Sequence, residues 1–160
     1  MPRKIRRAIC LRRNRGTRIN VKSPERVILH CSATPDFSDS NEKYDLFGAS
    51  DIDDWHRQRG FDEIGYHWVI RRTGIIESGR DELELGAHTM GHNTGSIGVC
   101  FIGMKDPTEI QVIALLILYS RIRRKYGIDY TNWFGHNEFN ARKSCPGISM
   151  NVLRELLRVG

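Results

Sequence analysis

The segment from residue 106 to 127, DPTEIQVIALLILYSRIRRKYG, constrains the fold of this chain more than any other. Thr108 followed by Gln111 forms a capping-box pattern at its start, and Gly127 is the residue type that commonly ends a helix. Apolar residues recur between them at helical spacing, namely Ile110, Ile113, Leu116, Ile117 and the segment 119–122. The apolar run at 112–119 is much shorter than the roughly 18 residues that span a bilayer, so we expect a long helix packed on a protein core.

Short apolar segments typical of strands lie before and after this helix. We expect strands at 26–33, 65–70 and 96–103, a hairpin that turns through Thr73-Gly74, and a strand end within 133–138. Two further helices are expected, one at 149–160 and one at 50–60 that is capped by Ser50 or Asp51 and stopped by Gly60. Strands interleaved with long helices predict a single-domain α/β fold.

The positive charge of the chain is confined to its N-terminal part. The whole chain carries a net charge of +6, whereas residues 1–26 hold ten Lys and Arg against one Glu, a net charge of +9. The rest of the chain is therefore slightly acidic. We expect a basic extension over residues 1–25 that contacts an anionic envelope or nucleic acid, although a solvated terminus would have the same composition.

The basic extension does not have the pattern of a secretory signal. Its apolar stretch, AICL at 8–11, is shorter than the roughly 7–15 residues that such a signal needs. We therefore expect synthesis in the cytoplasm. The four cysteines, at positions 10, 31, 100 and 145, are accordingly expected to be reduced.

The segment GHNEFNARKSCPG at 135–147 places His136, Lys143 and Cys145 close together. Zinc prefers His nitrogen and Cys sulfur, and a catalytic zinc site uses about three protein ligands. A third ligand is available at the end of the strand 26–33, either His30 or Cys31, since alternation sends neighbours to opposite faces. A buried core histidine and a buried thiol are the alternatives for these residues.

The sequence around each of the remaining four histidines indicates its role. We expect His56 on a helix surface and His67 in a structural role within a strand, whereas His88 and His92 lie in a Gly-rich loop and could line a cleft.

Three motifs in order, VILHCSAT at 27–34, the segment 65–103 that begins GYHWVI, and GHNEFNARKSCPG, resemble one protein family. They are similar to the zinc-dependent N-acetylmuramoyl-L-alanine amidases of the type-2 amidase and peptidoglycan-recognition-protein superfamily, and especially to the small phage endolysins among them. The resemblance runs from about residue 26 to the end. It implies a mixed central β-sheet flanked by helices, with an amidase domain over residues 26–160.

The resemblance also implies the site residues. One Zn²⁺ per chain would be held by His30, His136 and Cys145. Catalytic roles fall on Tyr66 and Lys143, and substrate-binding roles on His88 and Asn93, with the strand around 96–100 as groove wall. The recycling amidases of the superfamily have an aspartate as third ligand and a glutamate near the tyrosine position. Cys145 and Tyr66 therefore indicate the endolysin and recognition-protein branch.

The activity implied is hydrolysis of the amide bond between N-acetylmuramic acid and L-alanine in peptidoglycan, by a phage or prophage endolysin that lyses its host. We expect a monomer that acts on the cell wall after release, which needs another protein to give access to the wall. Two alternatives stay open: a bacterial amidase of peptidoglycan recycling or remodelling, and a peptidoglycan-binding or regulatory protein with little catalysis.

Overall fold

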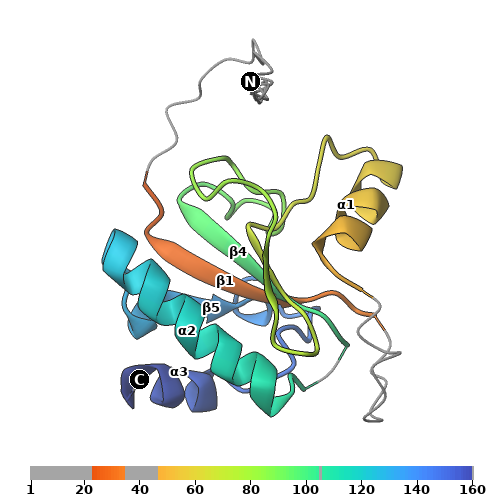
Figure 1. Ribbon diagram of the computed structural model, residues 1–160. Helices are drawn as coiled ribbons and strands as arrows, with labels where there is room; N and C mark the ends of the chain where they lie inside the picture. Colours follow the sequence, from red (N-terminus) through yellow and green to blue (C-terminus); the bar gives the residue numbers. More distant parts are fainter. Residues whose placement is uncertain (1–22, 35–46, 105, 160) are drawn as a thin grey trace, which may run out of the picture.

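The computed structural model describes residues 23–34, 47–104 and 106–159, and a five-stranded sheet forms its centre (Figure 1). The strands are β1 (Arg26–Cys31), β2 (Trp68–Ile70), β3 (Ile76–Ser78), β4 (Ser96–Phe101) and β5 (Trp133–Gly135), arranged in the order β3-β2-β4-β1-β5. Neighbouring strands are parallel except for the antiparallel pair of β2 with β3. The expected mixed central sheet of an α/β domain is confirmed.

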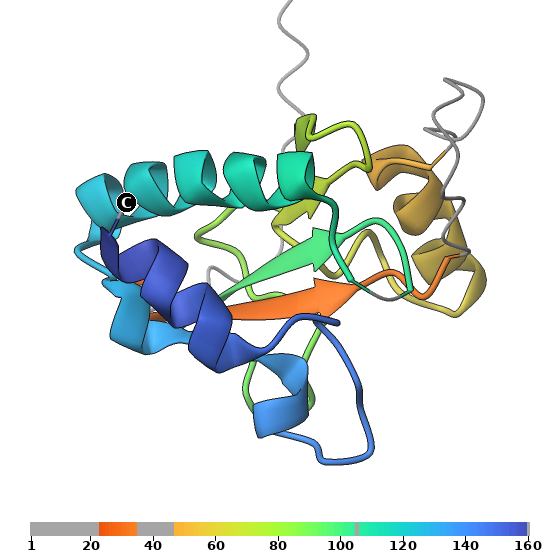
Figure 2. The ribbon, with the colours of Figure 1, turned by 90° about the horizontal axis from the view of Figure 1, so that it is seen from below.

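Helices cover both faces of this sheet (Figures 1 and 2). The helices α2 (Glu109–Tyr126) and α3 (Met150–Val159) lie on one face, where they bury the larger apolar core. The helix α1 (Ala49–Gln58) lies on the opposite face, over a smaller core that includes Ile52 and Val69. Two short 3-10 helices, η2 (Tyr130–Asn132) and η3 (His136–Glu138), flank β5.

The buried face of α2 differs from the expected one. Ile110, Ile113 and Ile117, which the helical spacing assigned to the apolar face, are each more than half exposed. The buried positions are instead Gln111, Ala114, Leu115, Leu118, Tyr119 and Ile122. Apolar residues recur at helical spacing on two sides of α2, so the sequence alone is consistent with burial of either side. Packing against the sheet determines which side is buried.

The helix ends in the structure agree in most places with those expected from the sequence. The side chain of Thr108 accepts the backbone N–H of Gln111, and Gly127 ends α2 in the left-handed conformation with φ 72°. The expected cap of α1, Ser50 or Asp51, was two or three residues too late. Gly48 is the N-cap, and Asp51 accepts the backbone N–H of Gly48 at 2.8 Å.

The basic extension, apart from residues 23–25, lies outside the described residues, as do residues 35–46. β1 begins at Arg26. Within the described segments, no helix is both long and apolar enough to cross a membrane.

Candidate metal centre

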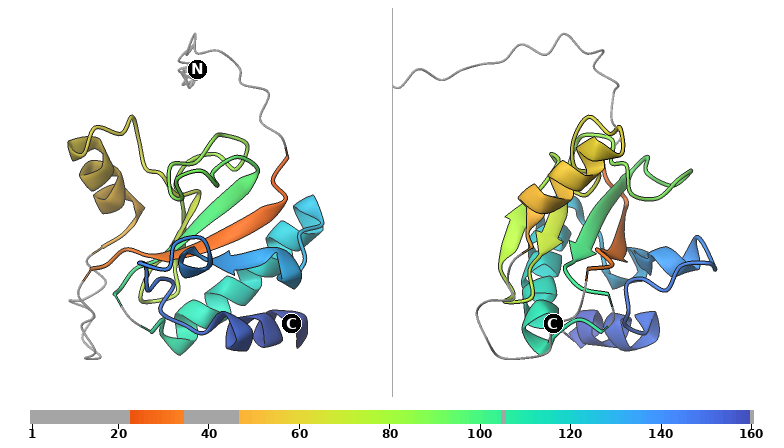
Figure 3. Two further views of the ribbon diagram at one scale, coloured as in Figure 1. Left: turned by 180° about the vertical axis from the view of Figure 1, so that it is seen from behind. Right: turned by 90° about the vertical axis from the view of Figure 1, so that its right-hand side faces the viewer.

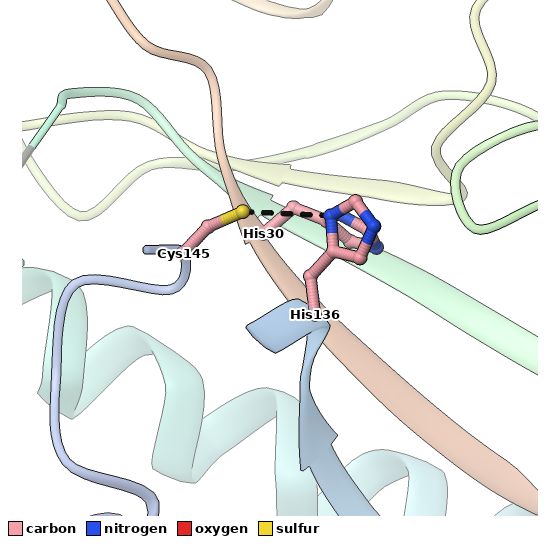
Figure 4. A group of neighbouring side chains, drawn as sticks. All are labelled: His30, His136 and Cys145. Carbon is pink, nitrogen blue, oxygen red and sulfur yellow. Dashed lines mark hydrogen bonds between the residues drawn. The ribbon is translucent and has the colours of Figure 1, made fainter. Parts of the chain in front are cut away.

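Three side chains meet at the carboxyl end of the parallel strands β1 and β5. His30 lies near the end of β1, His136 begins η3 directly after β5, and Cys145 lies in the loop before α3 (Figure 4). That loop returns to the strand ends in both views of Figure 3. One ligand atom from each residue lies within 4.8 Å of the others, and Cys145 Sγ is 3.5 Å from His136 Nδ1. Side chains far apart in the sequence thus form one compact cluster of nitrogen and sulfur donors.

The protonation states of this cluster favour a cation. A hydrogen bond from the Cys31 thiol outweighs the effect of burial and lowers the pKa of Cys145 to about 3, and the same contact raises the pKa of Cys31. Burial lowers the pKa of His30, so its imidazole is neutral at pH 7. A thiolate and imidazole nitrogens are the donor set that suits zinc. Of the two alternatives at the end of β1, His30 joins the cluster, and Cys31 contacts Cys145 from outside it.

Tyr66 lies beside His30. Its ring centroid is 5.1 Å from that of His30, and burial raises the pKa of its phenol well above the usual value. Tyr66 therefore stays protonated at neutral pH, which makes it a hydrogen-bond donor.

The exposed side chain of Lys143 borders a cavity of about 420 Å³. This cavity is lined by His88, Thr89, Met90, His136, Phe139, Asn140 and Lys143. It places one cation and one cluster member, His136, at the same concave surface.

His88 occupies a narrow slot behind the cluster. A Cβ atom added at Gly98 would lie 2.5 Å from His88 Cδ2, and one added at Gly86 would lie 2.6 Å from the same atom. Two glycines thus make room for the imidazole. Burial, followed by the neighbouring His30, lowers the pKa of His88 to about 2, so the ring is neutral. Asn93 holds this loop, because its side-chain oxygen accepts the backbone N–H groups of His88 and Thr89.

Thr89 and Ser96 were missed by the sequence reasoning, yet both contact these histidines. Thr89 Oγ1 lies 3.2 Å from His30 Nε2 and 3.0 Å from His88 Nδ1, while Ser96 Oγ lies 3.3 Å from His88 Nε2. The only signal available for Ser96 was a polar residue at the start of an otherwise apolar strand.

The other histidines lie apart from the cluster. The expectation that His56 is on the surface was wrong: it is buried, and its Nδ1 accepts the backbone N–H of Gly65 at 2.9 Å. Its spacing of four residues from the buried Ile52 could have indicated this. His67 has the structural role expected, since it is fully buried with both ring nitrogens bonded to backbone groups. His92 packs on the ring of Phe139, with centroids 4.5 Å apart.

Comparison with known proteins gives consistent matches. A family model described as N-acetylmuramoyl-L-alanine amidase matches residues 20–148. The endolysin of Escherichia phage T7 is 33% identical over 137 residues, which cover 81% of this chain and 84% of that protein. The structure of the N-acetylmuramoyl-L-alanine amidase LysC from Clostridium intestinale matches with a TM-score of 0.72 and 26% identity, over 86% of this chain and 87% of that one. A Drosophila PGRP-LB structure in complex with tracheal cytotoxin matches with a TM-score of 0.67 and 28% identity, over 79% and 77%.

Proposed function

The chain belongs to the N-acetylmuramoyl-L-alanine amidase family, and we propose that it performs this hydrolysis with one zinc ion held by His30, His136 and Cys145. The observation that carries the proposal is the meeting of these three donors within 4.8 Å at the ends of parallel strands. The bond cleaved is the amide between N-acetylmuramic acid and L-alanine.

The chemistry of the three donors supports zinc as the cation. Cys145 is held as a thiolate and His30 as a neutral imidazole, so neither must lose a proton when a cation binds at pH 7. Three protein donors leave a coordination position open, as catalytic zinc sites do. When bound, zinc supplies Lewis-acid polarisation of a carbonyl and activation of water near neutral pH.

The side chains around the cluster take the remaining roles in amide hydrolysis. Lys143 is the cation at the cavity surface and stabilises the negative charge that develops on the carbonyl oxygen. Tyr66 keeps its proton and donates a hydrogen bond beside His30. The cavity that Lys143 borders receives the substrate, with His88 on its wall, while Asn93 keeps the loop of His88 in place.

The substrate is peptidoglycan, and the biological role is that of an endolysin. A similar structure binds tracheal cytotoxin, and the chain covers most of a phage endolysin at 33% identity. The protein accordingly acts on the cell wall after release from the cell that makes it.

Mass spectrometry of digested murein tests the bond and the metal together. We expect new L-alanine amino termini in the digest, their loss after treatment with a chelator, and their return when zinc is added back. The variants Cys145→Ala and His30→Ala are expected to lose zinc and activity together. Full lysis by either variant, or cleavage that a chelator does not affect, would refute the zinc assignment.

A comparison of substrates separates the endolysin from a recycling amidase. Rates are measured on intact murein sacculi and on soluble muropeptides at equal bond concentration. An endolysin is expected to solubilise sacculi efficiently. A strong preference for soluble muropeptides would instead indicate recycling, and binding to sacculi without cleavage would indicate a recognition protein.

A further inference from the structure

A chain of hydrogen bonds leads from His30 away from the metal cluster into the protein. His30 Nε2 lies 3.0 Å from His88 Nδ1, and His88 Nε2 lies 3.3 Å from Ser96 Oγ. Ser96 Oγ in turn donates to the backbone carbonyl of Asn93 at 2.8 Å. Two imidazoles and one hydroxyl thus connect a donor of the cluster to a fixed backbone acceptor.

The backbone carbonyl fixes the direction of the whole chain. A carbonyl oxygen only accepts hydrogen bonds, so the hydroxyl hydrogen of Ser96 points to Asn93. The oxygen of Ser96 then accepts from His88, which places the proton of His88 on Nε2. His88 Nδ1 is therefore unprotonated and accepts from the Nε2–H group of His30.

Thr89 is compatible with this direction and does not reverse it. Its hydroxyl lies near both His30 Nε2 and His88 Nδ1, so it can accept from His30 while donating to His88. The reverse order needs a proton on His88 Nδ1. His88 Nε2 would then face the Ser96 oxygen with no hydrogen between them, since the Ser96 hydrogen is used by Asn93.

We propose that Ser96 and His88 are positioning residues that hold His30 as its Nε2–H tautomer, which leaves Nδ1 as the ring nitrogen that binds the metal. Hydrogen-bond partners of a metal-binding histidine set its tautomer and ring orientation in this way. The slot between Gly86 and Gly98 keeps the His88 ring in the required orientation. The inference rests on the proposed zinc site, to which it adds the ligand atom and its supporting residues.

The tautomers are measured directly by long-range ¹H–¹⁵N correlation NMR of the histidine rings in the zinc-loaded full-length protein. We expect a proton on Nε2 of both His30 and His88, and zinc on His30 Nδ1. A proton on Nδ1 of His88, or zinc on Nε2 of His30, would overturn the proposal. A purely structural His88 predicts no particular tautomer.

Zinc affinity, measured by competition with a chelator of known affinity, provides the second test. Ser96→Ala is expected to weaken zinc binding by about 10-fold, the lower end of the effect of such supporting residues, and to mix the His88 tautomers. Ser96→Thr keeps the hydroxyl and is expected to restore both. His92→Ala removes a histidine of the same loop outside the chain of hydrogen bonds, and zinc affinity should stay within about twofold.

The outcomes separate this proposal from the zinc assignment. If the wild-type protein binds zinc and Ser96→Ala changes neither the zinc affinity nor the His88 tautomer, the positioning role of Ser96 and His88 is refuted while the zinc site stands. If the wild-type protein binds no zinc, the proposed function fails. The His88 tautomer in that protein still shows whether the hydrogen bonds run in the proposed direction. If Ser96→Ala does not fold, which near-ultraviolet circular dichroism would reveal, the tautomers of His30 and His88 in the wild-type protein alone test the proposal.

Discussion

Replacement of Glu82 by alanine is expected to destabilise the protein without changing the His30, His136 and Cys145 cluster. The carboxylate of Glu82 is buried and accepts hydrogen bonds from Trp68 Nε1 at 2.8 Å, from the Tyr126 hydroxyl at 2.8 Å, and from the Lys125 ammonium group. It therefore ties the loop after β3 to the sheet and to the last turn of α2. The Glu82→Ala variant removes the acceptor and leaves these donors in place.

The size of this loss in the free energy of unfolding follows from the burial of each donor. Trp68 is buried, and an unpaired buried donor costs about 1–3 kcal/mol. The Tyr126 hydroxyl is partly buried and adds about 1 kcal/mol. The Lys125 side chain is 50% exposed, so water replaces its partner and its share is small. The expected loss in the free energy of unfolding is about 2–4 kcal/mol, which lowers Tm by roughly 5–15 °C for a domain of this size.

Urea denaturation followed by tryptophan fluorescence measures this loss. The matched control is Glu84→Ala, which removes an exposed glutamate two residues away, and it should change the free energy of unfolding by less than about 0.5 kcal/mol. A loss below about 1 kcal/mol for Glu82→Ala, or equal losses for the two variants, would refute the reasoning. Zinc content should be unchanged in both.

Four further outcomes are expected. Lys143→Ala should keep zinc and lose about 10²–10³-fold in kcat on murein, and an unchanged rate would contradict its role as an oxyanion donor. Tyr66→Phe removes only the hydroxyl and should lower kcat by about 10²-fold at unchanged zinc content, measured in the same assay. Gly98→Ala places a Cβ 2.5 Å from the His88 ring, so it should cost about 1–3 kcal/mol in urea denaturation and weaken zinc binding; wild-type values for both would show that the slot is not needed. Burial alone would raise the pKa of Glu82, but hydrogen bonds from Lys125, Tyr126 and Trp68 outweigh it and lower that pKa. The stabilisation by this carboxylate is therefore present above the unfolded value of 4.5 and lost as pH falls through the lower folded value, so the stability difference between wild type and Glu82→Ala should narrow below pH 4.5.

Much of the fold was predictable because its signals are local. The capping box at Thr108, the glycine at the end of α2 and the hairpin turn before β3 each act over a few residues, and the structure has all three where expected. The three ordered motifs identified the family, which the comparisons support, and indicated the three residues that the fold brings together as candidate metal ligands.

Only the tertiary structure determined which face of α2 and which polar side chains are buried. The spacing of α2 fits two apolar faces, and contact with the sheet buries Leu115 and Leu118 while Ile113 stays exposed. Glu82 lies in a loop by its local sequence, and its burial depends on partners more than 40 residues away in α2.

The surroundings of the His30 ring also depend on the tertiary structure. The sequence supplies an imidazole with two ring nitrogens, and the fold places His88, 58 residues away, against Nε2 of this ring and Ser96, 66 residues away, against His88. The physical reason is that a hydrogen bond depends on atoms within about 3 Å, and folding alone determines which distant residues meet at that distance.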